Sequence, residues 1–373
     1  MYNRLTELFG LKLPLFAFTT SPEVCVAVSR AGGLGVLGAI PYTADELAAH
    51  LDYIDRHIGN YRYGVDVVMP QKYVGVEAGV HYDKAAFMAM IPDGHRTFVD
   101  QLLQRYGVPP LAPGEQPRAD LLSWVHDLTR KQVDVALSHP IALLANALGP
   151  PPPDVVELAH QKRVKVAALA GSVRHAKKQV EAGVDLIVAQ GTEAGGHTGE
   201  ISTMVLVPEV VDAVHPVPVL AAGGIGSGRQ MAAALALGAS GAWTGSIWLT
   251  TTENQLTPRV VKEKLVAASS RDTVRSRAMT GKPARQLRTA WTEAWDSAGS
   301  PGTLPLPLQF LATAEAVTRI HVGAEAGHPG ARELLGSAVG QIVGRMNRIR
   351  PAADIVSEIA TELHQVLRLF PRE

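Results

Sequence analysis

Short runs of apolar residues alternate with amphipathic segments along most of the chain. Within each run successive positions are apolar, which is typical of parallel strands that helices cover on both faces. The pattern predicts eight strands, at residues 14–18, 33–39, 63–69, 141–148, 164–169, 185–190, 217–222 and 241–246. Because a predicted helical segment follows each strand, the pattern favours an α/β fold, a closed (β/α)8 TIM barrel rather than an open doubly wound sheet.

Local signals mark where two of the early helices begin. Ser21 is a suitable N-cap, and Pro22 fits the first turn of the helix that follows it. Thr43 and Glu46 have the spacing of a capping box. Further helices are expected at about 119–138, from Asp154 onward, and at about 173–182, 203–214 and 227–238.

Two segments depart from this alternation. Residues 70 to about 118 are too long and too rich in proline for an ordinary connection. We interpret them as an inserted excursion, a lid or an oligomer contact, with a helix around 95–106. After residue 251 the pattern is helical to the end, apart from a loop at 297–307 that is rich in glycine and proline. We therefore predict a barrel over 1–250 and a helical C-terminal segment over 251–373 that packs on it.

Composition and charge exclude several classes of function. The 35 basic residues balance the 35 acidic ones, so no long-range field draws the protein toward nucleic acid or anionic lipid. The single cysteine, Cys25, excludes a disulfide framework and a thiolate zinc cluster, and it fits a small buried position on a helix. The sequence contains neither a secretory signal pattern nor an apolar stretch long enough for a membrane span. We expect a cytoplasmic protein without nucleic-acid or membrane partners.

Glycines follow each of the last two predicted strands. The stretch "AAGGIGSGRQ" at 221–230 leads into a helix, and Gly245-Ser246 stands at the tip of the next strand. Glycines allow backbone N–H groups to approach an anion closely, and a helix N-terminus adds favourable partial charge. In TIM barrels the loops after strands seven and eight commonly form a phosphate site. We predict a phosphate site here, although glycines that only permit tight turns would leave the same pattern.

The stretch "AQGTEAGGHTGE" at 189–200 places His197 after the sixth strand, on the same rim of the barrel. Histidine titrates near neutral pH and can exchange a proton with a substrate. Neighbouring glycines would let a flat ring approach the backbone. His197 is therefore the candidate catalytic residue. A metal site with Glu193 or Glu200 lacks a third ligand at a convincing spacing, so no metal is expected.

Four stretches, together and in this order, resemble the FMN-dependent nitronate monooxygenases, formerly called 2-nitropropane dioxygenases. The most specific is "AQGTEAGGHTG", and the others lie at 29–39, 217–246 and 280–288. The resemblance covers most of the chain except the excursion at 70–118. It implies a TIM barrel that holds one non-covalent FMN.

The resemblance also assigns residues to the site. It implies that His197 is the active-site histidine beside the flavin and that Lys165, at the start of the fifth strand, puts a cation near the flavin N1–C2=O edge. Gln190 is implied as a second polar neighbour of the flavin, and Gln341 as a residue of the C-terminal segment that approaches it. All positions that we expect on the cofactor are Ala17, Phe18, Asp66, Lys165, Gln190, Ala194, Gly195, Gly196, Ala222, Gly223, Gly224, Gly245, Ser246 and Gln341.

The chain departs from the family pattern at three places. Ala17-Phe18-Thr19 stands where the family usually has Ala-Pro-Met, and Asp66 stands where asparagine is familiar. Ile247 and Trp248 follow Gly245-Ser246 where an arginine is common. We expect Phe18 and Trp248 to make the pocket more aromatic and Asp66 to be a poorer neighbour than asparagine for an electron-rich flavin. FMN binding is retained in this interpretation, but the substrate is left open.

The leading hypothesis is oxidation of a small-molecule nitronate or nitroalkane, with O2 as electron acceptor and a carbonyl compound and nitrite as products. His197 would remove the α-proton from a neutral nitroalkane. The alternative is an NAD(P)H-dependent FMN reductase that acts on quinones or enoyl thioesters, although no acidic residue follows "GGIGSG" at the spacing of a dinucleotide fingerprint. A flavin-free phosphate-binding barrel is a third possibility, disfavoured by "EAGGH". The apolar C-terminal helices and the excursion are compatible with a homodimer.

Overall fold

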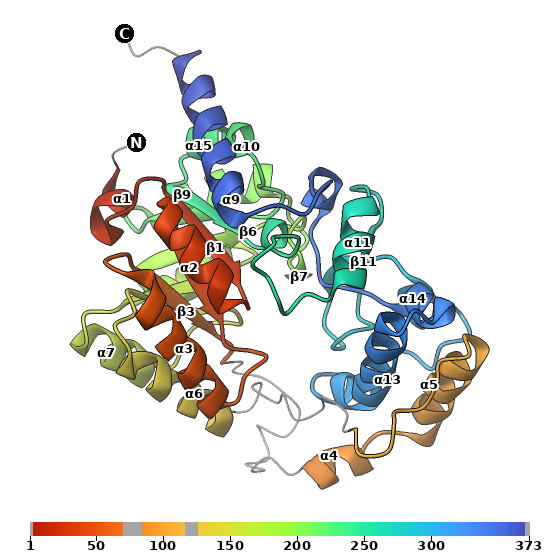
Figure 1. The fold of residues 1–373 in the computed structure, drawn as a ribbon. Helices are drawn as coiled ribbons and strands as arrows, with labels where there is room; N and C mark the ends of the chain where they lie inside the picture. Colours follow the sequence, from red (N-terminus) through yellow and green to blue (C-terminus); the bar gives the residue numbers. More distant parts are fainter. Residues whose placement is uncertain (1–2, 70–83, 116–125, 370–373) are drawn as a thin grey trace.

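The fold is a closed barrel of eight parallel strands, seen in a computed structural model that describes residues 3–69, 84–115 and 126–369 (Figure 1). The strand order around the barrel is β1-β2-β3-β4-β5-β6-β8-β9, so neighbours in sequence are neighbours in space. All eight predicted strands form, which confirms the TIM barrel. Their bounds are β1 Leu15–Thr19, β2 Leu34–Gly38, β3 Tyr63–Val67, β4 Leu143–Asn146, β5 Lys165–Ala170, β6 Leu186–Gln190, β8 Val219–Ala222 and β9 Gly241–Thr244.

Helices surround the barrel and begin close to where the sequence signals place them. Ser21 caps the first of them with Pro22 in its first turn, and Thr43 forms the expected capping box with Glu46. The helix expected from Asp154 begins one residue earlier, at Pro153. The outer helices are α2 Pro22–Ala31, α3 Ala44–Ile58, α6 His126–Ser138, α7 Pro153–Gln161, α8 Val173–Glu181, α9 Thr203–Val214, α10 Gly228–Ala236 and α15 Ala352–Arg368.

Strand alternation divides the apolar side chains into an inner and an outer core. Phe16 belongs to the inner core, whereas its neighbours Leu15 and Ala17 pack in the outer core between strands and helices. A short helix, α1 (Arg4–Phe9), adds Leu5 and Phe9 to the inner core, so it covers the end of the barrel where the strands start. The opposite end, where the strands finish, carries the glycine loops and His197.

The region after residue 251 is only partly helical, which corrects the expectation of an all-helical segment. It contains α11 (Arg259–Ala267), α12 (Ala290–Trp295), α13 (Leu308–Glu325) and α14 (Pro329–Leu334), but also an antiparallel hairpin of β10 (Thr273–Ser276) and β11 (Ala284–Leu287). A two-residue strand, β7 (Gly196–His197), pairs with β11 and completes a three-stranded sheet. The hairpin strands, TVRS and ARQL, contain no apolar run; they pair with each other, and β11 also pairs with β7, which lies far away in sequence.

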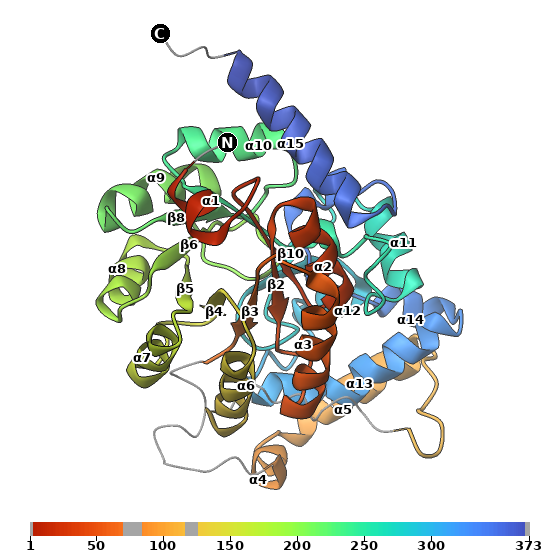
Figure 2. The ribbon, with the colours of Figure 1, turned by 60° about the vertical axis from the view of Figure 1, so that its left-hand side comes forward.

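The last helix, α15, packs against α10 and α2 and so lies on the barrel wall (Figure 2). By contrast, α13 packs with α14 and with α4 (Lys84–Ala89) and α5 (Asp93–Arg105), forming a separate group of helices beside the barrel (Figure 1). The helix expected around 95–106 is thus confirmed as α5. Residues 70–83 and 116–118 of the excursion lie outside the described residues, so its role as a lid or oligomer contact stays a prediction. Within the described ranges, no helix combines the length and apolarity that crossing a bilayer requires.

Candidate active site at the barrel mouth

Five of the predicted cofactor residues face one another across the mouth of the barrel, at the carboxyl ends of the strands. Ala222 belongs to the inner core and Phe18 packs against it. Gln190 is the register neighbour of Ala222, and Asp66 is the register neighbour of the inner-core residue Ala145. Gly245 lies two positions beyond the inner-core residue Trp243 and beside Phe18. Strand alternation therefore gathers residues of β1, β3, β6 and β8, and the glycine that follows β9, at one opening.

The loop after β6 is held in place from both sides. The Glu193 carboxylate accepts hydrogen bonds from the backbone N–H of Thr203, at 3.0 and 3.2 Å, and from its hydroxyl at 2.9 Å, so it caps the N-terminus of α9. On the other side, the Gln341 N–H donates to the Glu193 carbonyl at 2.9 Å. A Cβ at Gly195 would lie 2.8 Å from the backbone of residues 339–340. Only glycine permits this close approach, which fixes the loop that carries His197.

His197 is the catalytic candidate, and its surroundings keep it neutral. It lies in β7 opposite Ala284 of β11, and its Nε2 is 2.7 Å from the Thr280 hydroxyl oxygen. Burial, with a smaller contribution from the charge of Lys282, lowers the pKa of His197 to about 4. At neutral pH the imidazole is therefore uncharged and able to accept a proton.

Thr280 and Lys282 are neighbours of His197 that did not appear among the predicted site residues. Lys282 is half-buried, and burial alone lowers the pKa of its ammonium group. Across the described ranges, no carboxylate forms an ion pair with it. The stretch at 280–288 carries the family resemblance but no motif that points to the chemistry of Thr280 or Lys282. The site thus combines a neutral imidazole with a cation that no described carboxylate neutralises.

The two glycine loops make a cradle with few side chains. Gly223 has a φ of 101° and Gly224 a φ of 70°, and a Cβ at Gly223 would lie 2.9 Å from the Thr203 hydroxyl oxygen. The Gly340 N–H donates to the Ser246 hydroxyl oxygen at 2.9 Å, which leaves the Ser246 proton available for an anion. The glycines after β8 and the Gly245-Ser246 pair after β9 thus follow two paired strands at one end of the barrel, an arrangement typical of a phosphate site.

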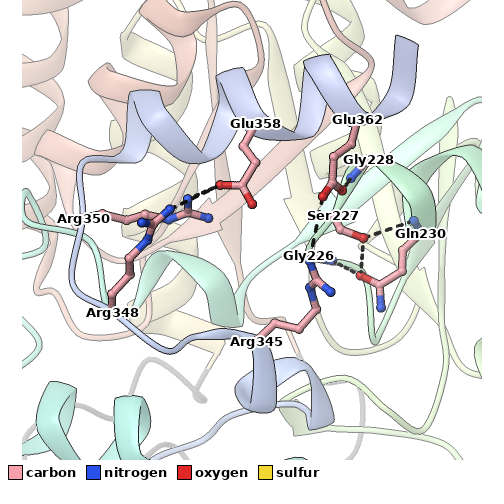
Figure 3. A network of polar contacts seen from close by, with 9 residues as sticks. All are labelled: Gly226, Ser227, Gly228, Gln230, Arg345, Arg348, Arg350, Glu358 and Glu362. Atoms are coloured by element: carbon pink, nitrogen blue, oxygen red, sulfur yellow. Dashed lines mark hydrogen bonds and ion pairs between the residues drawn. The ribbon is translucent and has the colours of Figure 1, made fainter. Parts of the chain in front are cut away.

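The N-terminus of α10 itself is already satisfied by side chains (Figure 3). The N–H of Gly226 and the hydroxyl of Ser227 donate to the Gln230 side-chain oxygen, both at 3.0 Å. The Gly228 N–H donates to Glu362 of α15 at 2.9 Å. The N-terminus of α10 is therefore not free to bind an anion, as the sequence had suggested. The backbone N–H groups that could bind one are those of Gly223 and Gly224, in the loop before α10.

The mouth fits a flat, anionic cofactor by two observations. A Cβ at Gly196 would meet no atom within 4 Å, and one at Gly245 would meet only the Phe18 ring at 3.7 Å, so both positions border open space. One carboxyl oxygen of Asp66, Oδ1, is buried without a hydrogen-bond partner. A flat ring would fill the open space beside these two glycines, and its polar edge would give Asp66 Oδ1 a hydrogen-bond partner.

Other predicted residues lie elsewhere. Lys165 begins β5 and is therefore at the opposite end of the barrel, where its Nζ lies 2.7 Å from Asp185, so it does not face the mouth. The side chain of Ala17 packs in the outer core. Trp248 is also in the outer core, with its indole nitrogen 3.1 Å from the Thr244 carbonyl oxygen, so the expectation that it makes the pocket aromatic is wrong. Phe18, by contrast, lies at the mouth. Ala194 is buried in the loop beside Gly195.

The two glutamates considered as metal ligands have other partners. Glu193 caps α9 as described above, and Glu200 lies 3.3 Å from Arg275 in an exposed ion pair. In the part of the chain that the structure covers, no group of three or more His, Cys, Asp or Glu side chains is arranged to hold a metal ion.

Comparisons with known proteins identify the family of this chain. The family model described as "Nitronate monooxygenase" matches residues 3–362. The Mycobacterium tuberculosis protein "Putative monooxygenase Rv1533" is 54% identical over 367 residues, which are 97% of this chain and 96% of that protein. A "Probable nitronate monooxygenase" of Staphylococcus aureus (strain JH9) is 27% identical over 98% of both chains. The solved structure of a nitroalkane oxidase from Streptomyces ansochromogenes superposes with a TM-score of 0.78 at 26% identity, covering 99% of this chain and 100% of that one.

Proposed function

We propose a function for this chain from the premise that it belongs to the nitronate monooxygenase family and is a flavin oxidoreductase. Its flavin is FMN, bound non-covalently at the barrel mouth, and its substrates are alkyl nitronates and the nitroalkanes from which they form. O2 is the electron acceptor, and the products are a carbonyl compound and nitrite. The observation that carries this proposal is the half-buried Lys282 beside the neutral His197, with no carboxylate of the described residues in an ion pair with it.

Lys282 binds the charge of the substrate in this proposal. A nitronate carries its negative charge on the two oxygens of the nitro group, which suits an ammonium partner. Partial burial removes competing water and strengthens the attraction between opposite charges. Because no carboxylate of the described residues neutralises Lys282, an anionic substrate would be its first ion-pair partner.

His197 orients the reacting carbon and accepts its proton when the substrate is a neutral nitroalkane. Its hydrogen bond to Thr280, at 2.7 Å, fixes the orientation of the ring. With a pKa of about 4 it is always in the accepting form near neutral pH, yet it is a weak base. This weakness and the nearby cation both favour nitronates, which have already lost the proton, over neutral nitroalkanes.

The glycine loops hold the cofactor. Gly223, Gly224, Gly245 and the Ser246 hydroxyl would bind the FMN phosphate, and Gly196 would lie against the flavin ring. When bound, FMN supplies the redox chemistry that a nitronate oxidation needs. Gln190 would contact the polar edge of the ring from the end of β6.

The experiment that tests this proposal replaces Lys282. In Lys282→Met we expect the KM for a small alkyl nitronate to rise at least about tenfold, which equals about 1.4 kcal/mol of lost binding. The KM for the neutral nitroalkane should change little. Lys282→Arg, which keeps the charge, is the matched control and should stay within a few fold of the wild type. An unchanged nitronate KM in Lys282→Met would contradict the assignment of Lys282.

A further inference from the structure

Asp66 is a buried residue at the mouth, and within the described residues its carboxyl Oδ1 accepts no hydrogen bond. It is the fourth residue of β3, only 2% exposed, and it points inward because its register neighbours are Gly38 of β2 and the inner-core residue Ala145 of β4. Its Oδ1 has no hydrogen-bond partner. A polar side chain so placed is aimed at the space where the cofactor and substrate bind.

An ionised carboxylate at this position would be costly. Taking a charge out of water without a partner is unfavourable, so a buried acid retains its proton instead. The strands on either side present a glycine and an alanine to Asp66 and no counter-charge. Burial alone raises the pKa of Asp66 to about 8.

The helices packed on β3 supply no counter-charge either. Both α2 and α6 contact β3 from the outer face, the side opposite to Asp66. Those of their ionisable side chains that the structure describes are Glu23, Cys25, Arg30, Arg130, Lys131 and Asp134. Among the residues that the structure describes, Asp66 therefore faces the mouth without an ionic neighbour on its own side of the strand.

We propose that Asp66 is a neutral carboxylic acid in the working enzyme and that its O–H donates a hydrogen bond to the flavin. This inference rests on the proposed function, because it places the flavin at the mouth. A neutral donor stabilises negative charge on an electron-rich ring, whereas a carboxylate at the same place would repel it. Asp66 is thus a cofactor-binding residue whose protonation sets the affinity for the flavin and the ease of reducing it.

The first test needs no cofactor. The unfolded chain ionises Asp66 near its ordinary pKa of 3.8, but the folded chain does so only near 8, so folded stability falls as pH rises between these values and the loss is complete above 8. Asp66→Asn cannot ionise and should escape this loss. In urea unfolding of the apoprotein, the midpoint of Asp66→Asn should therefore rise relative to that of the wild type from about pH 5 to about pH 8 and then stay parallel. Urea midpoints of the two proteins that stay parallel over the whole pH range would contradict the proposal that Asp66 is protonated.

The second test measures FMN dissociation constants at about pH 6.5 and about pH 9.5. The wild type should bind FMN at least about tenfold more weakly at the higher pH, whereas Asp66→Asn, which keeps an N–H donor, should change little. Asp66→Leu, which has no donor, should bind weakly at both values. Equal affinity of all three proteins would show that Asp66 donates nothing to the flavin. Failure of every protein, wild type included, to bind FMN would refute the proposed function, while the apoprotein result would still report the protonation of Asp66.

Discussion

Replacing Gly245 by alanine should weaken FMN binding without lowering the stability of the barrel. Gly245 directly follows β9 with a φ of −129°, outside the left-handed region that demands glycine. A Cβ there would meet only the Phe18 ring, at 3.7 Å, an ordinary van der Waals contact. The free energy of unfolding of the apoprotein should therefore change by less than about 1 kcal/mol.

The same methyl group projects into the place that we assign to the cofactor. A phosphate or ring edge packed against Gly245 would have to move away from it and would lose at least one charge-assisted hydrogen bond. Such a bond contributes about 1.5–3 kcal/mol, so the FMN dissociation constant should rise by about ten- to a hundredfold.

The assay pairs urea unfolding of the apoprotein with titration of FMN by flavin fluorescence. Gly223→Ala is the control, because Gly223 has a φ of 101° and a Cβ there would lie 2.9 Å from the Thr203 hydroxyl oxygen. This variant should lose both stability and FMN. Gly245 does not border the cofactor if Gly245→Ala binds FMN as tightly as the wild type, and it does not tolerate a Cβ if Gly245→Ala unfolds as easily as Gly223→Ala.

Two further predictions concern His197 and α15. His197→Ala should keep FMN and nitronate turnover but lose turnover of neutral nitroalkanes. The apoprotein stability gives a second test with His197→Asn, because burial lowers the pKa of His197 to about 4. The free energy of unfolding of the wild type, relative to that of His197→Asn, should fall by up to about 3 kcal/mol as the pH falls from 6.5 to about 4. A pH-independent difference in urea midpoints would contradict this. Glu362→Gln should weaken the bond from the Gly228 N–H and cost about 1 kcal/mol, with faster hydrogen exchange at the start of α10; unchanged exchange there would mean that the bond does not secure α10 to α15.

The barrel could be predicted because each of its strands is buried on both faces and leaves a continuous apolar run. Once the strands are placed, the rule that parallel strands finish at one end brings His197, Gly223 and Gly245 to the same rim without further information. The same rule explains the error at Lys165: a residue at the start of β5 must lie at the far end of the barrel, whatever chemistry a lysine could offer a flavin.

Contacts between distant segments could not be predicted in this way. Thr280 and His197 are 83 residues apart, and they meet because β7 pairs with a hairpin whose strands contain no apolar run. Trp248 follows a mouth residue in sequence, but a turn of 3-10 helix directs its side chain into the outer core. Hydrophobic periodicity predicts which face of a helix or strand is buried. The positions of Thr280 and Trp248 depend instead on single turns and on contacts with distant segments of the chain.

The central claim, that this flavin enzyme oxidises nitronates, is tested most directly by the anaerobic visible spectrum of the purified holoprotein. A small alkyl nitronate is added to one cuvette, and NADH and then NADPH to another. We predict that the nitronate removes the oxidised flavin bands and that neither nicotinamide cofactor does. Bleaching by NADH or NADPH, with no change on adding nitronate, would contradict it and would favour a reductase of quinones or enoyl thioesters.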